Sequence, residues 1–278
     1  MPKTLNIAGR LINFSTPQIM GILNVTPDSF YGGSRVIQQD DVCRKAEKML
    51  KDGATFLDVG GHSTRPHADP VPEDEELRRV LPAVEILAHK FPEAFISIDT
   101  FRASIAKQCV AAGAHVINDI GGGNLDVAMF STVAQLGIPY ILMNSRGNPQ
   151  TMTQLNQYDD LITDVLRELQ AKIYQLRQLG VKDIIADLGF GFAKNADQNY
   201  VLLRELRTFQ MLDVPLLVGV SRKSMIWRKL DLTPDQALNG TTVLHTVALL
   251  NGASILRVHD VREAAEAIKL IDLLHHCR

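Results

Sequence analysis

Acidic and amide side chains recur at the ends of short apolar segments that lie far apart in this 278-residue sequence. Asp99 closes the run FISID, Asn118 follows HVI, and Asp187 closes DIIAD. Carboxylate and amide groups at buried positions offer paired acceptors and a donor. That set suits a flat heterocycle that carries an amino group and a ring N–H.

Two further apolar segments end in cations. Lys223 follows LLVGV within the stretch SRKS, and Arg257 and His259 lie in RVHD. Together with the Ser and Thr hydroxyls, these groups suit phosphate or carboxylate oxygens. Beside a phosphate, the amide of Asn24 could supply an oxygen ligand to Mg²⁺, a hard cation that keeps most of its waters.

The elements that must position these residues follow one repeated pattern. A helical segment ends at a glycine, which suits a left-handed C-cap, and a short apolar run follows. A run without a polar face suits a parallel strand that is covered on both sides. The predicted strands are Ile19–Asn24, Thr55–Gly60, Phe95–Asp99, His115–Asp119, Tyr140–Asn144, Asp183–Asp187, Leu216–Val220 and Ser254–His259.

Eight strands that alternate with helices predict an α/β fold, a (β/α)8 TIM barrel, with a doubly wound open sheet as the alternative. The clearest helix spans Gln157–Leu179, where apolar residues repeat at three and four positions. Residues 1–15 are expected to form a short N-terminal β-hairpin that covers the bottom of the barrel. No linker-like stretch divides the chain, so residues 1–278 are expected to form one domain. Sites in such barrels form at the C-terminal ends of the strands, where the polar residues above would converge.

Composition excludes several classes of partner and cofactor. The formal net charge is −2 without a block of like charges, so neither nucleic acid nor a membrane surface is expected as a partner. The three cysteines are scattered, which indicates reduced thiols in a cytoplasmic protein. The histidines are too dispersed for a zinc site. The glycine-rich stretches match neither the dinucleotide fingerprint nor the P-loop.

The order of the motifs resembles one known family, the dihydropteroate synthases of folate biosynthesis. The motifs that carry this resemblance are GILNVTPDSF, GGHSTRP, SIDTF, NDI, GFGFAK, VGVSRKS and RVHD. The resemblance implies a transferase that joins 6-hydroxymethyl-7,8-dihydropterin pyrophosphate to p-aminobenzoate and releases 7,8-dihydropteroate and pyrophosphate. It also implies a pterin-binding barrel domain, Mg²⁺ that accompanies the pyrophosphate, and a homodimer. Enzymes of this family are the targets of sulfonamides.

The resemblance further implies a role for each matching residue. The pterin would be bound by Asp99, Asn118, Met143, Asp187, Lys223 and Arg257. The pyrophosphate would be bound by Asn24, Thr64, Arg257 and His259, with Asn24 as the Mg²⁺ ligand. The p-aminobenzoate would be bound by Phe30, Pro66, Phe192 and Ser221. The catalytic residues would be Asp28, Thr64, Arg65 and Lys223.

Three positions depart from the family pattern: His62 replaces Glu, Asn144 replaces His, and Leu188 replaces Pro. Three alternative functions remain open. The chain could be a pterin-barrel methyltransferase that acts on methyltetrahydrofolate, an aldolase with a Schiff base on Lys223, or a non-catalytic pterin-binding homologue.

The predicted helices Pro234–Leu250 and Glu263–Leu274 carry more apolar residues than one inward face needs. A wide core stripe is the preferred interpretation of this excess, and a dimer surface is the alternative.

Overall fold

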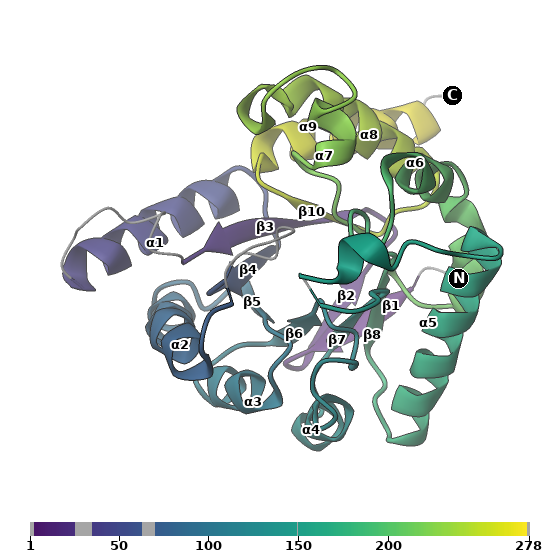
Figure 1. Ribbon diagram of the computed structural model, residues 1–278. Helices are drawn as coiled ribbons and strands as arrows, with labels where there is room; N and C mark the ends of the chain where they lie inside the picture. Colours follow the sequence, from purple (N-terminus) through teal and green to yellow (C-terminus); the bar gives the residue numbers. More distant parts are fainter. Residues whose placement is uncertain (1–2, 26–34, 63–69, 149, 277–278) are drawn as a thin grey trace.

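Eight parallel strands close into a barrel in the order β10-β3-β4-β5-β6-β7-β8-β9 (Figure 1). The computed structural model describes residues 3–25, 35–62, 70–148 and 150–276. The strands are β3 Gln18–Asn24, β4 Phe56–Gly60, β5 Phe95–Asp99, β6 Val116–Asp119, β7 Tyr140–Met143, β8 Ile184–Asp187, β9 Leu216–Val218 and β10 Ile255–Val258. The closed barrel confirms the predicted fold and excludes the open sheet. Every strand lies within the predicted run or extends it by one residue.

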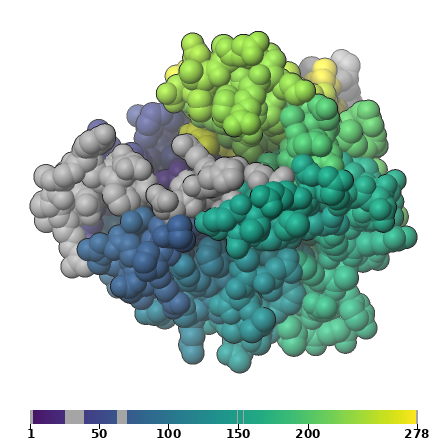
Figure 2. Space-filling model, viewed as in Figure 1, coloured from purple at the N-terminus to yellow at the C-terminus, as the bar shows by residue number. Residues whose placement is uncertain are grey.

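The helices surround the strands (Figure 1), and Figure 2 shows the surface of the molecule from the same side. They are α1 Arg35–Lys51, α2 Glu73–Lys90, α3 Ala103–Ala111, α4 Met129–Leu136, α5 Leu161–Gln178, α6 Ala196–Arg204, α7 Ser224–Trp227, α8 Leu238–Leu250 and α9 Val261–His276. Short 3-10 segments span Met152–Gln154, Leu206–Leu212 and Pro234–Gln236. Helix α5 begins four residues later than predicted because the Asp160 side chain accepts the Thr163 N–H and caps it.

A two-stranded antiparallel sheet, β1 Thr4–Ile7 and β2 Arg10–Asn13, precedes the barrel. Its turn uses the positive φ angles of Ala8 (49°) and Gly9 (80°), which match the twist of a tight hairpin. Leu5, Ile7 and Ile12 pack in one buried cluster with residues near the start of the barrel strands, among them Phe56 and Phe95. The hairpin therefore covers the amino-terminal end of the barrel, opposite the end where the predicted site residues lie.

Successive residues of each strand point alternately to the interior and to the exterior of the barrel. In β5, Phe95 belongs to the interior cluster behind the hairpin, whereas Ile96 and Ile98 pack against the helices. Asp99 has the parity of Phe95, so it lies on the interior side, at the carboxyl end of the strand. In β6, Val116 belongs to the same interior cluster, so Asn118, two residues later, also lies on the interior side.

The apolar excess on the last two helices is not buried in a core stripe. Val243 on α8 is 54% exposed, and Leu270, Leu273 and Leu274 on α9 are 66%, 52% and 65% exposed. The preferred interpretation of these positions was therefore wrong, because the inward faces of α8 and α9 are already filled by other residues such as Ala248 and Ala264. These side chains instead form part of the exposed surface of the described residues.

Cys43 and Cys109 are buried free thiols, as expected for reduced cysteines. Across the part of the chain that the structure describes, no helix is long and apolar enough to cross a membrane.

Candidate active site

Arg257 on β10 binds carboxylates from two other strands, β4 and β5, toward the carboxyl end of the barrel. Its Nε donates to Oδ2 of Asp58 at 2.6 Å, and its Nη2 donates to Oδ2 of Asp99 at 2.7 Å. The amide of Asn118 donates to the same oxygen of Asp58 at 2.9 Å. The predicted residues Asp99, Asn118 and Arg257 thus form one cluster, and Asp58 on β4 holds it together.

Asp58 was missed by the sequence reasoning, which considered the carboxyl ends of the strands and the loops that follow them. It lies in the middle of FLDVG, two residues after Phe56 of the interior cluster. That spacing is the signal that could have identified it, since a carboxylate at an interior position of an apolar strand must find a partner. The partner, Arg257, lies 199 residues away in the sequence.

Each carboxylate of the cluster retains one oxygen without a partner. Oδ1 of Asp58 and Oδ1 of Asp99 are buried and accept no hydrogen bond from the residues described. Burial raises the pKa of Asp99 to about 7, although the Arg257 guanidinium opposes the shift. Burial also lowers the pKa of Arg257, but Asp58 and Asp99 outweigh it, so the net pKa is raised. Unsatisfied buried acceptors are costly, so these two oxygens are suited to N–H donors from a ligand.

Lys223 and Asp187 interact electrostatically with each other and with Arg257. Lys223 donates to the carbonyl oxygen of Phe190, and its Nζ lies 4.8 Å from the centre of the Phe192 ring. Burial lowers the pKa of Lys223 to about 8, while Asp187 and Asp99 raise it and Arg257 lowers it further. Burial raises the pKa of Asp187, and Lys223 opposes that shift. Lys223 and Arg257 thus interact electrostatically with the carboxylates of Asp99 and Asp187.

The hydroxyl of Ser221 connects the ends of β9 and β10. Its Oγ accepts the backbone N–H of His259 at 3.2 Å and lies 3.0 Å from Nδ1 of the same residue. Arg222, the neighbouring cation, turns away and donates from Nε and Nη2 to Asp260 at 2.9 and 2.7 Å. Of the two cations in SRKS, only Lys223 therefore joins the site, while Arg222 anchors the loop.

Asn24 lies at the carboxyl end of β3 and is exposed. A side chain at Gly60 on the neighbouring strand would lie 3.5 Å from Oδ2 of Asp99 and 3.6 Å from Oδ1 of Asn24, so both groups approach the same glycine. No group of three or more His, Cys, Asp or Glu residues that could hold a metal occurs within the described ranges. A single amide oxygen fits Mg²⁺ where phosphate and water supply the other ligands.

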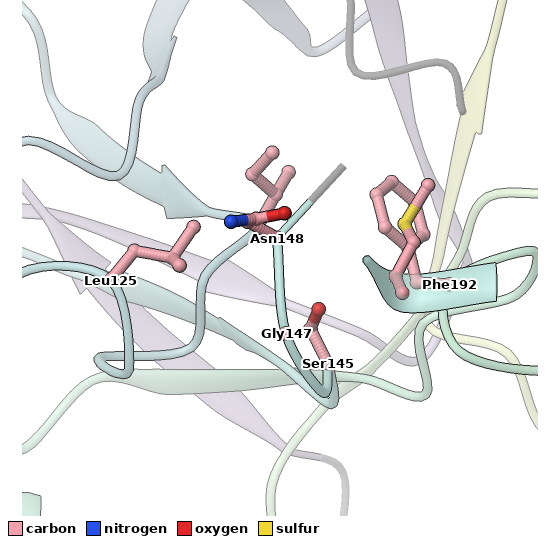
Figure 3. A pocket seen from close by; sticks show the side chains of 7 residues that line it. Leu125, Ser145, Gly147, Asn148 and Phe192 are labelled. Atoms are coloured by element: carbon pink, nitrogen blue, oxygen red, sulfur yellow. The ribbon is translucent and has the colours of Figure 1, made fainter. Parts of the chain in front are cut away.

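Met143 and Phe192 belong to one apolar cluster beside the charged residues. The cluster also contains Ile120, Met152 and Ala193. Figure 3 shows a small pocket next to it, between the segments that follow β6 and β7 and the ring of Phe192. The lining residues are Ile120, Leu125, Ser145, Gly147, Asn148, Met152 and Phe192. Met143 and Phe192, the two predicted apolar contacts, thus lie in one apolar cluster.

Five predicted residues, Asp28, Phe30, Thr64, Arg65 and Pro66, lie outside the described residues, so their roles stay predictions.

His62, a departure from the family pattern, is buried behind the site. Its Nδ1 lies 3.7 Å from Oε1 of Glu76, and its ring meets Phe101 edge-on with centroids 5.4 Å apart. Burial, with Arg102 and Arg79, lowers the pKa of His62 to about 4. His62 is therefore neutral at pH 7, and Glu76 obtains its hydrogen bonds from Arg102 and Thr100 instead.

Comparisons with known proteins identify the family of this chain. Residues 20–259 match the family of pterin binding enzymes. The dihydropteroate synthase of Escherichia coli (strain K12) is 42% identical over 266 residues, which cover 95% of this chain and 94% of the relative. A crystal structure of the Yersinia pestis dihydropteroate synthase with a sulfonamide drug complex has a TM-score of 0.91 at 41% identity and covers 98% and 99% of the two chains. The Xanthomonas albilineans dihydropteroate synthase with 4-aminobenzoic acid has a TM-score of 0.92 at 35% identity and covers 100% of both chains. The chain therefore belongs to the pterin-binding enzymes, in the dihydropteroate synthase family that its motifs resemble.

Proposed function

We propose that this chain condenses 6-hydroxymethyl-7,8-dihydropterin pyrophosphate with p-aminobenzoate and releases 7,8-dihydropteroate and pyrophosphate. The observation that carries the proposal is the pair of buried, unpartnered oxygens on Asp58 and Asp99 at the carboxyl end of the barrel. A pterin edge offers amino and ring N–H groups to such acceptors, as the family membership leads us to expect. Asn118, Asp187 and Lys223 then complete the pterin site, and Met143 lines it.

The leaving group and the second substrate occupy the outer part of this site. Asn24, Thr64, Arg257 and His259 bind the pyrophosphate, and Ser221, Phe192, Phe30 and Pro66 bind the p-aminobenzoate. When bound, Mg²⁺ supplies positive charge beside the pyrophosphate, and Asn24 is the side chain that would hold it. Because Nε and Nη2 of Arg257 both donate to carboxylates, Arg257 also orients Asp58 and Asp99.

The chemistry needs charge stabilisation more than a strong base. Positive charge develops on the pterin methylene as pyrophosphate leaves, and the arylamine that attacks is already neutral at pH 7. Asp28 would stabilise the cation, with Thr64 and Arg65 beside it, while Lys223 lies where the two substrates meet. One well-placed group of this kind is worth about 3–4 kcal/mol of barrier.

The proposal is tested by measuring pyrophosphate release with both substrates, with each alone, and after removal of Mg²⁺. Release that requires both substrates and is reduced by a chelator is expected. Activity with methyltetrahydrofolate instead would favour the methyltransferase, and a borohydride-trapped adduct on Lys223 would favour the aldolase. Pterin binding by calorimetry without any turnover would indicate a non-catalytic homologue.

We also propose that the chain forms a homodimer through the exposed apolar residues of α8 and α9. Val243, Leu270, Leu273 and Leu274 contribute to this surface. A groove between the two helices has a mixed lining of Leu238, Asn239, Thr242, Thr246, Glu263, Glu266, Ala267, Leu270 and Ile271. Several large apolar side chains exposed on two packed helices, with polar residues between them, are typical of a protein interface. A cytoplasmic location fits the buried, unpaired Cys43 and Cys109.

A further inference from the structure

A buried lysine outside the predicted site organises the loop that follows β8. Lys194 is 8% exposed, and its Nζ donates to Oδ1 of Asn144 at 2.8 Å. The same Nζ lies 3.1 Å from the carbonyl oxygen of Phe192 and 3.4 Å from that of Gly189. One ammonium group thus connects the end of β7 to two carbonyls of the loop 188–194.

The backbone of this loop lies directly against β7. Gly189 has a φ of +69°, and a Cβ there would lie 1.9 Å from the carbonyl oxygen of Asn144. The loop amides also have fixed partners, since Gly189 N–H donates to Asp187 at 2.8 Å and Gly191 N–H donates to Asn199 at 2.7 Å. The loop has little freedom as long as Lys194 holds its carbonyls.

The opposite side of the same loop supports Lys223. The carbonyl of Phe190 accepts from Nζ of Lys223, the ring of Phe192 lies beside that Nζ, and a Cβ at Gly191 would lie 3.3 Å from Cδ of Lys223. Three consecutive loop residues therefore surround the Lys223 side chain. A shift of the loop would move the ammonium of Lys223 and the aromatic wall together.

Asn144 is in turn held from helix α5. Its amide donates to Oε2 of Glu168 at 2.7 Å, and Glu168 also pairs with Arg146. The guanidinium of Arg146 stacks on Tyr158 at 3.9 Å, and the Tyr158 hydroxyl donates to the carbonyl of Ala193 at 3.1 Å. The departure from the family's His at position 144 is thus an amide that accepts from Lys194 and donates to Glu168.

We infer that Lys194, held by Asn144, is a positioning residue that fixes the loop 188–194 and, through it, Lys223 and the ring of Phe192. The inference rests on the proposed function, because it concerns the residues at which the two substrates would meet. Neither Lys194 nor Asn144 needs to touch a substrate for this role.

The test replaces Lys194 by methionine, which retains the apolar stem and removes the ammonium. Lys3→Met is the matched control, since Nζ of Lys3 also donates to a backbone carbonyl, that of Val214 at 2.7 Å, but at the opposite end of the barrel. We expect Lys194→Met to lower kcat/KM for both substrates by about 100-fold, as for a misplacement of the order of 1 Å. Lys3→Met should leave kcat/KM unchanged.

Hydrogen exchange of the peptide 188–195 gives a readout that does not depend on turnover. In Lys194→Met its amides should exchange about tenfold faster, the size expected for the loss of a buried hydrogen bond, whereas Lys3→Met should leave them unchanged. Asn144→Leu should act in the same direction but less strongly, and it serves as the second variant if Lys194→Met does not fold.

A double-mutant cycle identifies the route of the effect. Against a Lys223→Ala background, Lys194→Met should cause a clearly smaller loss of substrate affinity by calorimetry than in the native protein, because the part of its effect that acts through Lys223 is already lost. Full additivity would overturn the inference, as would unchanged exchange in a folded Lys194→Met. If the native protein released no pyrophosphate, the proposed function would fail, and the exchange measurement would still decide whether Lys194 fixes the loop.

Discussion

Replacing Asp58 by alanine removes the residue that joins three strands of the site. Arg257 would lose the hydrogen bond from its Nε, and Asn118 would lose the acceptor of its amide, while Asp99 would still bind Nη2 of Arg257. Breaking a buried ion pair by removing one partner costs about 3–5 kcal/mol. Because Arg257 retains Asp99, we expect the lower end of that range, about 3 kcal/mol of unfolding free energy.

This loss is large enough to measure by thermal and urea denaturation. For a chain of this size, about 3 kcal/mol corresponds to a decrease of roughly 6–12 °C in Tm. The control is Glu93→Ala, which breaks the pair with Arg10 at 3.3 Å, where the Glu93 side chain is 95% exposed. Such a surface pair is worth at most about 1 kcal/mol.

The same variant tests the site. Without Asp58, Asp99 alone must balance Arg257, so its free oxygen becomes a weaker and less fixed acceptor for a pterin N–H. We expect pterin affinity by calorimetry to fall together with stability, and Asp58→Asn, which keeps the shape, to be intermediate in both. The reasoning would be refuted if Asp58→Ala lost no more stability than Glu93→Ala, because the buried cluster would then be unnecessary.

Three other measurements test separate parts of the structure. The kcat/KM should fall as pH rises through about 8, where Lys223 loses its proton, and Lys223→Arg should remove that fall; an unchanged alkaline limb would assign it to another group. Gly189→Ala should lower Tm more than Gly137→Ala, since both have positive φ but only Gly189 has a backbone carbonyl in the way; left-handed backbone alone costs about 1–2 kcal/mol. Leu270→Asp should shift the protein from dimer to monomer in sedimentation experiments, whereas Leu11→Asp, at a similarly exposed position on the hairpin, should not; a monomeric native protein would contradict the proposed dimer.

The positions of the strands and helices were accessible from the sequence because they depend on local patterns. Glycines such as Gly53 and Gly113 end helices with positive φ, and apolar runs without a polar face become covered strands. The residues at strand ends, including Asp99 and Asp187, could likewise be placed at one end of a barrel, since all parallel strands point the same way. The order of the motifs supplied the family.

Contacts across the barrel were decided only by the tertiary structure. Strand closure brings Asp58 to Arg257, and it directs Arg222 to Asp260 while Lys223 enters the site. The sequence contains the two-residue alternation that puts Asp58 inside, but alternation within one strand does not reveal which residue of another strand faces it. That depends on the register between strands that are neighbours in space only after closure. The exposed leucines of α9 follow the same rule, because the amount of apolar surface that a helix buries is set by the neighbours it meets.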